Sequence, residues 1–154
     1  MKIKWLGSVL IIALVMVSGI SCHCEDDSTI FPRETSLKEA GKVLGVEIPR
    51  PAYLPEGYKT KEVILQDKGT VLLKIRNEDD YEIELRVDWG IVPVRGLEKP
   101  KVDINGTTGY LFDDNKIMWN LQPATDKGVF VLTLSAGKGL PTAELLLTAK
   151  SVGW

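Results

Sequence analysis

Apolar and polar residues alternate without a fault from Tyr81 to Trp89. An alternation with a period of two is typical of a strand that has one face in a core and one in water. Residues 71–76 repeat the pattern, with Val, Leu and Ile at every second position. The two runs are separated by the acidic segment 77–80, so we predict that they form a hairpin. The apolar set of the longer run is Tyr81, Ile83, Leu85, Val87 and Trp89.

Shorter runs with strand character fill most of the remaining chain. Turn residues separate them, above all Asn105-Gly106 and the acidic segment 113–115. Connections this short favour antiparallel pairing and argue against a parallel, nucleotide-binding sheet. The further predicted strands are 59–66, 102–104, 108–112, 116–121 and 129–134.

Two helices are predicted, one near each end of the folded region. Ser36 and Glu39 have the spacing of a capping box, and Gly45 is a natural helix stop. The second helix begins at Pro141 or Thr142, since proline suits a first helical turn. The apolar residues on their inner faces are Leu37, Ala40 and Leu44 in the first helix and Leu145, Leu146 and Ala149 in the second.

The order of these elements predicts an α+β fold. We expect an antiparallel β-sheet of about six to seven strands, with an N-terminal and a C-terminal helix packed on it. Residues 46–57 contain three prolines and must be extended or turning. Their Ile48, Tyr53 and Leu54 are expected to lie across an apolar surface.

The first 21 residues have the three parts of a secretory signal peptide. Lys2 and Lys4 precede an uncharged stretch from Trp5 to Val17, and small residues lead to Cys22. The apolar stretch is shorter than the roughly 20 residues that a membrane-spanning helix needs. An uncleaved N-terminal anchor is the alternative, and it would also leave the rest of the chain outside. Residues 22–34 are then a polar tether, and 35–154 a single domain.

Cys22 stands where a bacterial lipoprotein carries its lipid-modified cysteine. Ile20-Ser21-Cys22 resembles the end of a lipobox, although Gly19 replaces the usual large aliphatic residue. Acylation of Cys22 would attach the chain to a membrane through buried CH₂ groups. Ordinary signal-peptidase cleavage after Ser21 is the alternative. The predicted location is the outer side of the cytoplasmic membrane, or the periplasm or outer membrane in a host with two membranes.

Charge and composition exclude some classes of function. The 154 residues have a net charge of −2, which becomes −4 once Lys2 and Lys4 leave with the leader. No basic footprint for nucleic acid exists. His23 is the one histidine and lies in the tether, so a Ser-His-Asp or Cys-His mechanism lacks its base in the folded region. No sequence motif of a hydrolase, a phosphate loop or a dinucleotide site occurs. We predict neither enzymatic activity nor a cofactor.

Three groups of residues are candidates for chemical sites. Cys22, His23 and Cys24 lack the second ligand pair of a structural zinc site, so we predict no metal. Glu82 and Glu84 could in principle form the carboxylate pair of a glycosidase. Both fall on the charged face of the alternating strand, which favours a solvent-exposed role. The acidic turns match no calcium-binding loop, and Asp and Asn favour turns for backbone reasons.

The aromatic residues of the predicted strands offer a binding hypothesis. Trp89 and Trp119 are in phase with core residues, so packing is the default interpretation. Alternatively, Trp89, Trp119 and Tyr110 line a sheet face that accepts an apolar ligand or a partner peptide. The predicted function is therefore an exported, lipid-anchored, non-enzymatic envelope domain that binds a ligand or protein partner. The alternatives are a sensor or interaction module of an envelope regulatory system and a binder of apolar ligands that resembles lipoprotein carriers.

From about residue 50 the order of short motifs resembles a bacterial extracytoplasmic family, the domain of unknown function 4367. The resemblance begins at Tyr-Leu-Pro-Glu-Gly-Tyr, residues 53–58, and continues with 102–106 and Gly109-Tyr110. A strand centred on Trp119, the strand from Val129 and a closing helix over 145–151 follow. The resemblance implies a domain of lipoproteins or of the outer portions of membrane-tethered regulators, and it supplies no catalytic residue.

Overall fold

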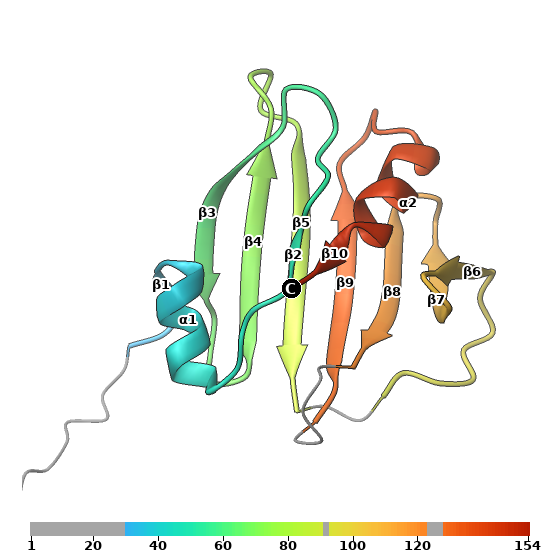
Figure 1. The fold of residues 1–154 in the computed structure, drawn as a ribbon. Helices are drawn as coiled ribbons and strands as arrows, with labels where there is room; N and C mark the ends of the chain where they lie inside the picture. Colours follow the sequence, from blue (N-terminus) through green and yellow to red (C-terminus); the bar gives the residue numbers. More distant parts are fainter. Residues whose placement is uncertain (1–29, 91–92, 123–127) are drawn as a thin grey trace, which may run out of the picture.

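The computed structural model describes residues 30–90, 93–122 and 128–154. Eight antiparallel strands form the main sheet, in the order β1-β3-β4-β5-β9-β8-β7-β6 (Figure 1). A separate two-stranded ribbon pairs β2 with β10. The elements are β1 (Arg33–Glu34), α1 (Leu37–Leu44), β2 (Arg50–Pro51), β3 (Lys59–Leu65), β4 (Thr70–Arg76), β5 (Glu82–Trp89), β6 (Lys101–Ile104), β7 (Thr107–Phe112), β8 (Lys116–Leu121), β9 (Phe130–Ala136), α2 (Thr142–Lys150) and β10 (Val152–Gly153).

The α+β class and the antiparallel sheet are confirmed, but the sheet has eight strands rather than six to seven. The seven predicted strands correspond to β3 through β9. The additional strand is β1, whose Arg33 and Glu34 pair with Leu65 and Ile64 of β3. Two residues are too few to show a periodicity, and β1 belongs to the segment that composition marks as a polar tether. Its pairing extends the sheet into that segment.

One face of the sheet carries the core. Both helices and the segment between α1 and β3 cross the front of this face in Figure 1. Alternate residues of the strands point into the layer between sheet and helices, and Trp119 is its largest side chain, with 1% exposed. Neither helix of the described residues has the length and hydropathy needed to cross a bilayer. The helix residues in this core are Ala40 and Leu44 of α1 and Leu145 and Ala149 of α2.

A capping box has two reciprocal hydrogen bonds, and the start of α1 forms one of them. The Glu39 N–H donates to the Ser36 hydroxyl oxygen at 3.2 Å. The Glu39 carboxylate accepts from the Thr35 hydroxyl at 3.1 Å, where a capping box would have it accept from the Ser36 N–H. Gly45 ends the helix with a φ of 70°, as its position predicts.

The strong turn signals are confirmed by backbone geometry. Asn105 and Gly106 both have positive φ, of 51° and 81°, as the central residues of a two-residue hairpin turn require. Asp113 and Asp114 have φ of 51° and 59°. This left-handed conformation accounts for Asp and Asn at these positions without a bound ion.

Tyr81 and Tyr53 differ from their predicted places. Tyr81 lies before β5 and is 52% exposed, because its N–H donates to the Asn77 side chain at 2.9 Å and so belongs to the turn. In the proline-rich segment, Ile48 is buried as expected. Tyr53 instead faces solvent, and its hydroxyl donates to Glu144 of α2 at 2.6 Å.

Candidate functional site

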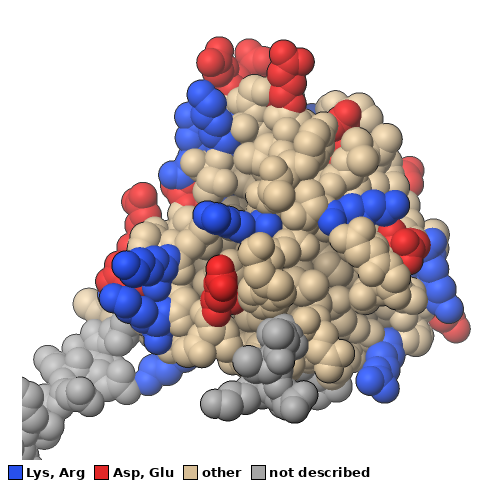
Figure 2. All heavy atoms as spheres, viewed as in Figure 1, with Lys and Arg blue, Asp and Glu red and all other residues tan. Residues whose placement is uncertain are grey.

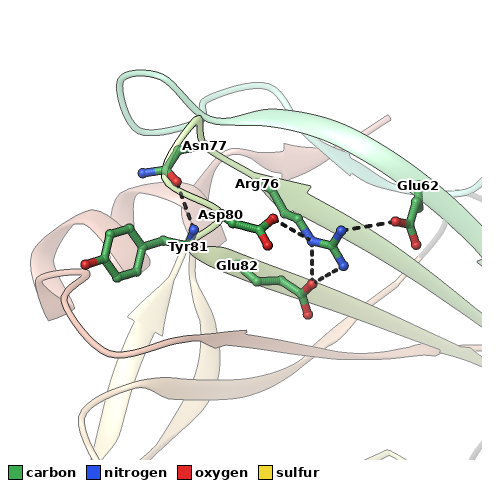
Figure 3. A network of polar contacts seen from close by, with 6 residues as sticks. All are labelled: Glu62, Arg76, Asn77, Asp80, Tyr81 and Glu82. Carbon is green, nitrogen blue, oxygen red and sulfur yellow. Dashed lines mark hydrogen bonds and ion pairs between the residues drawn. The ribbon is translucent and has the colours of Figure 1, made fainter.

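On the face of the sheet opposite the core, charged residues pair with one another. Arg76 of β4 lies between carboxylates of β3, β5 and the turn (Figure 3). Its Nη1 is 3.2 Å from Glu62, and its Nε and Nη2 are each 2.8 Å from Glu82. Asp80 is 3.8 Å away. The hydrogen bond to Glu82 is the main reason that the pKa of Arg76 is raised.

A second set of polar contacts surrounds Asp88 of β5. The Asp88 carboxylate, only 8% exposed, accepts from Arg86 Nε at 2.8 Å and from the Thr70 hydroxyl at 2.8 Å. This bond to Asp88 is the main reason that the pKa of Arg86 is raised. On the second face of the sheet Arg76 and Arg86 therefore already have carboxylate partners, which come from neighbouring strands for Arg76 and from the same strand for Arg86.

Glu82 and Glu84, the candidate carboxylate pair for glycoside hydrolysis, lie on the face of the sheet opposite the core. Glu82 is engaged by Arg76, and Glu84 stands opposite Lys74 in the β4–β5 register. Neither lines either of the depressions described below. Their surroundings fit the solvent-face interpretation, and no part of the described geometry supports an acid–base pair.

The predicted aromatic binding face is divided between two environments. Trp119 is packed in the core, and Trp89 lies on the same face with its ring 4.5 Å from that of Phe130. Tyr110 points to the opposite face, because the residue that pairs with Trp119 is its neighbour Gly109 and successive side chains alternate. The structure therefore brings the two tryptophans to one face and leaves Tyr110 on the other. Trp119 is 1% exposed within the core cluster, in agreement with the packing interpretation of this residue.

Tyr110 is covered by the segment that precedes β6. Its hydroxyl oxygen accepts from the Gly96 N–H at 3.1 Å. Asn120 of β8 holds the same segment by two bonds of 2.9 Å, one from the Val94 N–H and one to the Val94 carbonyl. Sequence reasoning did not foresee this cover, because the segment has no periodicity.

Two adjoining depressions lie on the core side of the molecule, between α1 and the β2–β10 ribbon. Their volumes are about 650 Å³ and about 510 Å³. Both are lined by Leu37 and Arg50, so we treat them as one surface and call it the α1–ribbon groove. The residues that define it are apolar Leu37, Val46 and Ile48, basic Lys38, Lys42 and Arg50, acidic Glu47, and at the ribbon end Thr60, Ser151 and Trp154.

Gly41 shapes the wall of this groove. A Cβ at Gly41 would lie 2.8 Å from the Val46 carbonyl oxygen, which is closer than real contacts allow. The Val46 N–H donates to the Gly41 carbonyl at 3.1 Å, so the chain turns back tightly against α1. Glycine inside a helix costs about 1 kcal/mol relative to alanine, and here this close approach requires it.

The groove differs from the opposite face in its charge. Lys38, Lys42 and Arg50 are exposed and make no ion pair with any residue in the described parts of the chain. Glu47 is the carboxylate among the lining residues. In Figure 2 basic side chains gather on the left, around α1, with acidic ones beside them, and a separate acidic group lies at the top, over the β4–β5 turn. Such a groove suits an anionic ligand with an apolar part.

The sequence contained one signal for the groove. Lys38 and Lys42 are four residues apart in the predicted helix and therefore neighbours on its surface. Like charges at this spacing weaken a helix, so they contribute nothing to its stability. Arg50 gave no such signal, because its approach to α1 depends on the turn after Gly45.

The predicted lipidation site, Cys22, lies outside the described residues, as do His23 and Cys24. Within the described parts, no cluster of three or more His, Cys, Asp or Glu residues could hold a metal ion. No family model matches this chain, and neither a curated protein nor a solved structure matches it. The resemblance to the domain of unknown function 4367 stays a prediction.

Proposed function

We propose that this chain is the precursor of an exported, lipid-anchored, non-enzymatic domain that binds an anionic ligand or partner through the α1–ribbon groove. The observation that carries the proposal is the position of Cys22, directly after an uncharged apolar stretch and a short run of small residues. The groove supplies the binding half of the proposal.

The anchor and the folded region are close together in the chain. At about 3.5 Å per residue, the chain from Cys22 to Ile30 spans at most about 28 Å. Each buried CH₂ of an acyl chain contributes about 0.8 kcal/mol to membrane affinity, and two or more chains hold a protein firmly. A domain anchored in this way works at the membrane surface.

The groove has the composition of a binding site. Its cations, Lys38, Lys42 and Arg50, can pair with carboxylate or phosphate oxygens, and Val46 and Ile48 give it an apolar wall. General acid–base catalysis needs a titratable group that moves a proton to or from the substrate. Glu47 is the one carboxylate among the lining residues and has no second carboxylate there to form an acid–base pair with, so the three cations and the apolar wall favour binding over catalysis.

The anchor is tested by expressing the full precursor in bacteria supplied with radiolabelled palmitate. We expect label in the wild type and in Cys24→Ala, the matched control two residues away, and no label in Cys22→Ala. Globomycin, which blocks lipoprotein signal peptidase, should cause the larger precursor to accumulate. An unlabelled wild-type product whose mobility globomycin does not change would overturn the anchor.

A protein partner is the second candidate function, and it is favoured by the ribbon end of the groove. Trp154 is exposed there, with its ring 5.5 Å from that of Phe130, and Tyr53 is exposed on the adjacent segment. Tryptophan and tyrosine carry much of the binding energy of protein interfaces. Cross-linking in the native envelope followed by a pull-down should capture one defined envelope protein, and Trp154→Ala should lose it. The absence of any capture would count against this candidate.

A further inference from the structure

We infer that the α1–ribbon groove docks the domain on a bilayer surface rich in anionic phospholipid. The inference rests on the proposed lipid anchor and deepens it, because it names what the groove binds and which way the anchored domain faces. The occupant is the layer of phosphate headgroups, with the upper part of the acyl chains beneath it.

First, the predicted anchor holds α1 close to the membrane. The groove begins at Leu37, in the first helix after the predicted anchor, and the first described residues lie beside α1 in Figure 1. With Cys22 in the bilayer, Ile30 is held within about 28 Å of it. Of the described elements, β1 and α1 therefore follow most closely on the membrane anchor.

The second step is charge. The mature chain is acidic, at −4, so an anionic surface repels the domain as a whole and can hold it only by a local basic patch. Lys38, Lys42 and Arg50 form that patch, and none has an ion-pair partner among the described residues. The acidic β4–β5 turn lies over another part of the molecule (Figure 2). Among the lining residues three cations stand against one carboxylate, that of Glu47, so charge favours the orientation with the groove toward the phosphates and the turn away from them.

The third step is apolar contact. Leu37 and Val46 line the groove as half-buried apolar residues, and Trp154 at its ribbon end is 51% exposed. Apolar side chains beside basic ones are the usual composition of a helix that lies at the headgroup boundary. The lysine stems can extend along this boundary while their ammonium groups contact phosphate.

The test uses the processed, acylated chain with Cys24→Ser, reconstituted into vesicles. An environment-sensitive fluorophore is attached at Trp154→Cys, at the ribbon end of the groove, where the native side chain is 51% exposed. Matched controls carry it at Leu147→Cys on α2 and Tyr81→Cys before β5, where the native side chains are 51% and 52% exposed. The vesicles contain either phosphatidylcholine alone or equal parts of phosphatidylcholine and phosphatidylglycerol.

We expect the emission of the Trp154→Cys probe to rise about two-fold, with a blue shift, only in the phosphatidylglycerol vesicles, as for an apolar side chain entering the interface. Both control positions should stay unchanged. Added salt should reduce the effect. The double variant Lys38→Glu and Lys42→Glu should abolish it. The variant Lys116→Glu and Lys138→Glu changes the net charge equally, outside the groove, and should keep it.

The anchor and the docking fail in different ways. Acylated protein floats with both kinds of vesicle, so a chain that does not float with phosphatidylcholine would overturn the anchor and the inference with it. A chain that floats, but whose Trp154→Cys probe responds equally in both lipids or keeps its response after the charge reversal, would overturn docking alone. A probe that responds to an envelope protein and not to phosphatidylglycerol would assign the groove to a protein partner and would also overturn it.

Discussion

The molecule uses its basic side chains in two ways. On the second face of the sheet, Arg76 and Arg86 are surrounded by carboxylates from their own or neighbouring strands. In the α1–ribbon groove, Lys38, Lys42 and Arg50 have no such partners within the described residues. The first group serves the fold, and the second is available to something outside it.

The difference follows from the register of the sheet. Glu82 of β5 stands directly opposite Arg76, and Glu62 of β3 stands opposite Lys74, two residues away along β4, so the Arg76 guanidinium can reach carboxylates on both adjacent strands. The carboxylates nearest in the chain to the cations of the α1–ribbon groove, Glu39 of α1 and Glu47 of the groove, form no ion pair with them within the described residues. The cations without an ion-pair partner in the α1–ribbon groove are therefore a better guide to a binding surface than the paired arginines of the sheet.

The largest expected effect separates the floor of the groove from its rim. Ile48 lines the groove but is 4% exposed and belongs to the core, so Ile48→Ala should lower the free energy of unfolding by about 2–4 kcal/mol. Lys42→Ala on the rim should change it by no more than about 0.5 kcal/mol. Urea denaturation measures both. Equal losses for the two variants would mean that the rim is also part of the fold.

A smaller effect tests whether the paired cations stabilise the fold. Asp88→Ala removes the acceptor of both Arg86 and Thr70 from a nearly buried position, which should cost about 2–3 kcal/mol. Asp88→Asn keeps one acceptor oxygen and should cost less. Asp79→Ala in the exposed β4–β5 turn is the control and should be close to neutral. A neutral Asp88→Ala would remove this contrast between the two faces.

The same comparison can be made on the cations themselves. Arg76→Gln should destabilise the protein, because Glu62 and Glu82 would then face each other without a counter-charge. Lys38→Gln should leave stability unchanged or raise it slightly, since it removes repulsion from Lys42 at the i,i+4 spacing. The unfolding temperatures of the two variants are measured at low and at high salt. Because salt screens charge interactions, the difference in unfolding temperature between Arg76→Gln and Lys38→Gln should be smaller at high salt. A loss of stability in Lys38→Gln would indicate that the lysine has a structural partner.

The sequence predicted the parts of the fold that depend on local pattern. The alternation from Glu82 to Trp89 is β5, and the turn at Asn105-Gly106 has the backbone its residues require. The sequence did not predict the parts of the fold that depend on pairing between strands far apart in the chain. Arg33 and Glu34 form β1 only because the edge of β3 is available to them.

The candidate site shows the same limit. Trp119 and Tyr110 both lie in correctly predicted strands, but the faces they point to depend on the register between β7 and β8. Arg50 belongs to the groove because the chain turns back at Gly41, a contact between backbone atoms that no residue pattern encodes. The charge of Lys38 and Lys42 could be predicted from the sequence, whereas the groove that they line could not.

The smallest expected effect concerns how the segment bearing Arg50 is held. Tyr53, three residues further on, donates its hydroxyl to Glu144 of α2, and this bond is the main reason that its pKa is raised above the ordinary value of 10.0. A raised pKa means that the bond stabilises the fold below that ordinary value and that the contribution is lost as pH rises through the folded-state pKa. Glu144→Gln should therefore lower the pKa of Tyr53, measured as the difference in tyrosinate absorbance between each protein and its Tyr53→Phe variant. An unchanged pKa would mean that the segment is held by the ribbon alone, where the Tyr53 N–H bonds to Ser151, and that the position of Arg50 does not depend on α2.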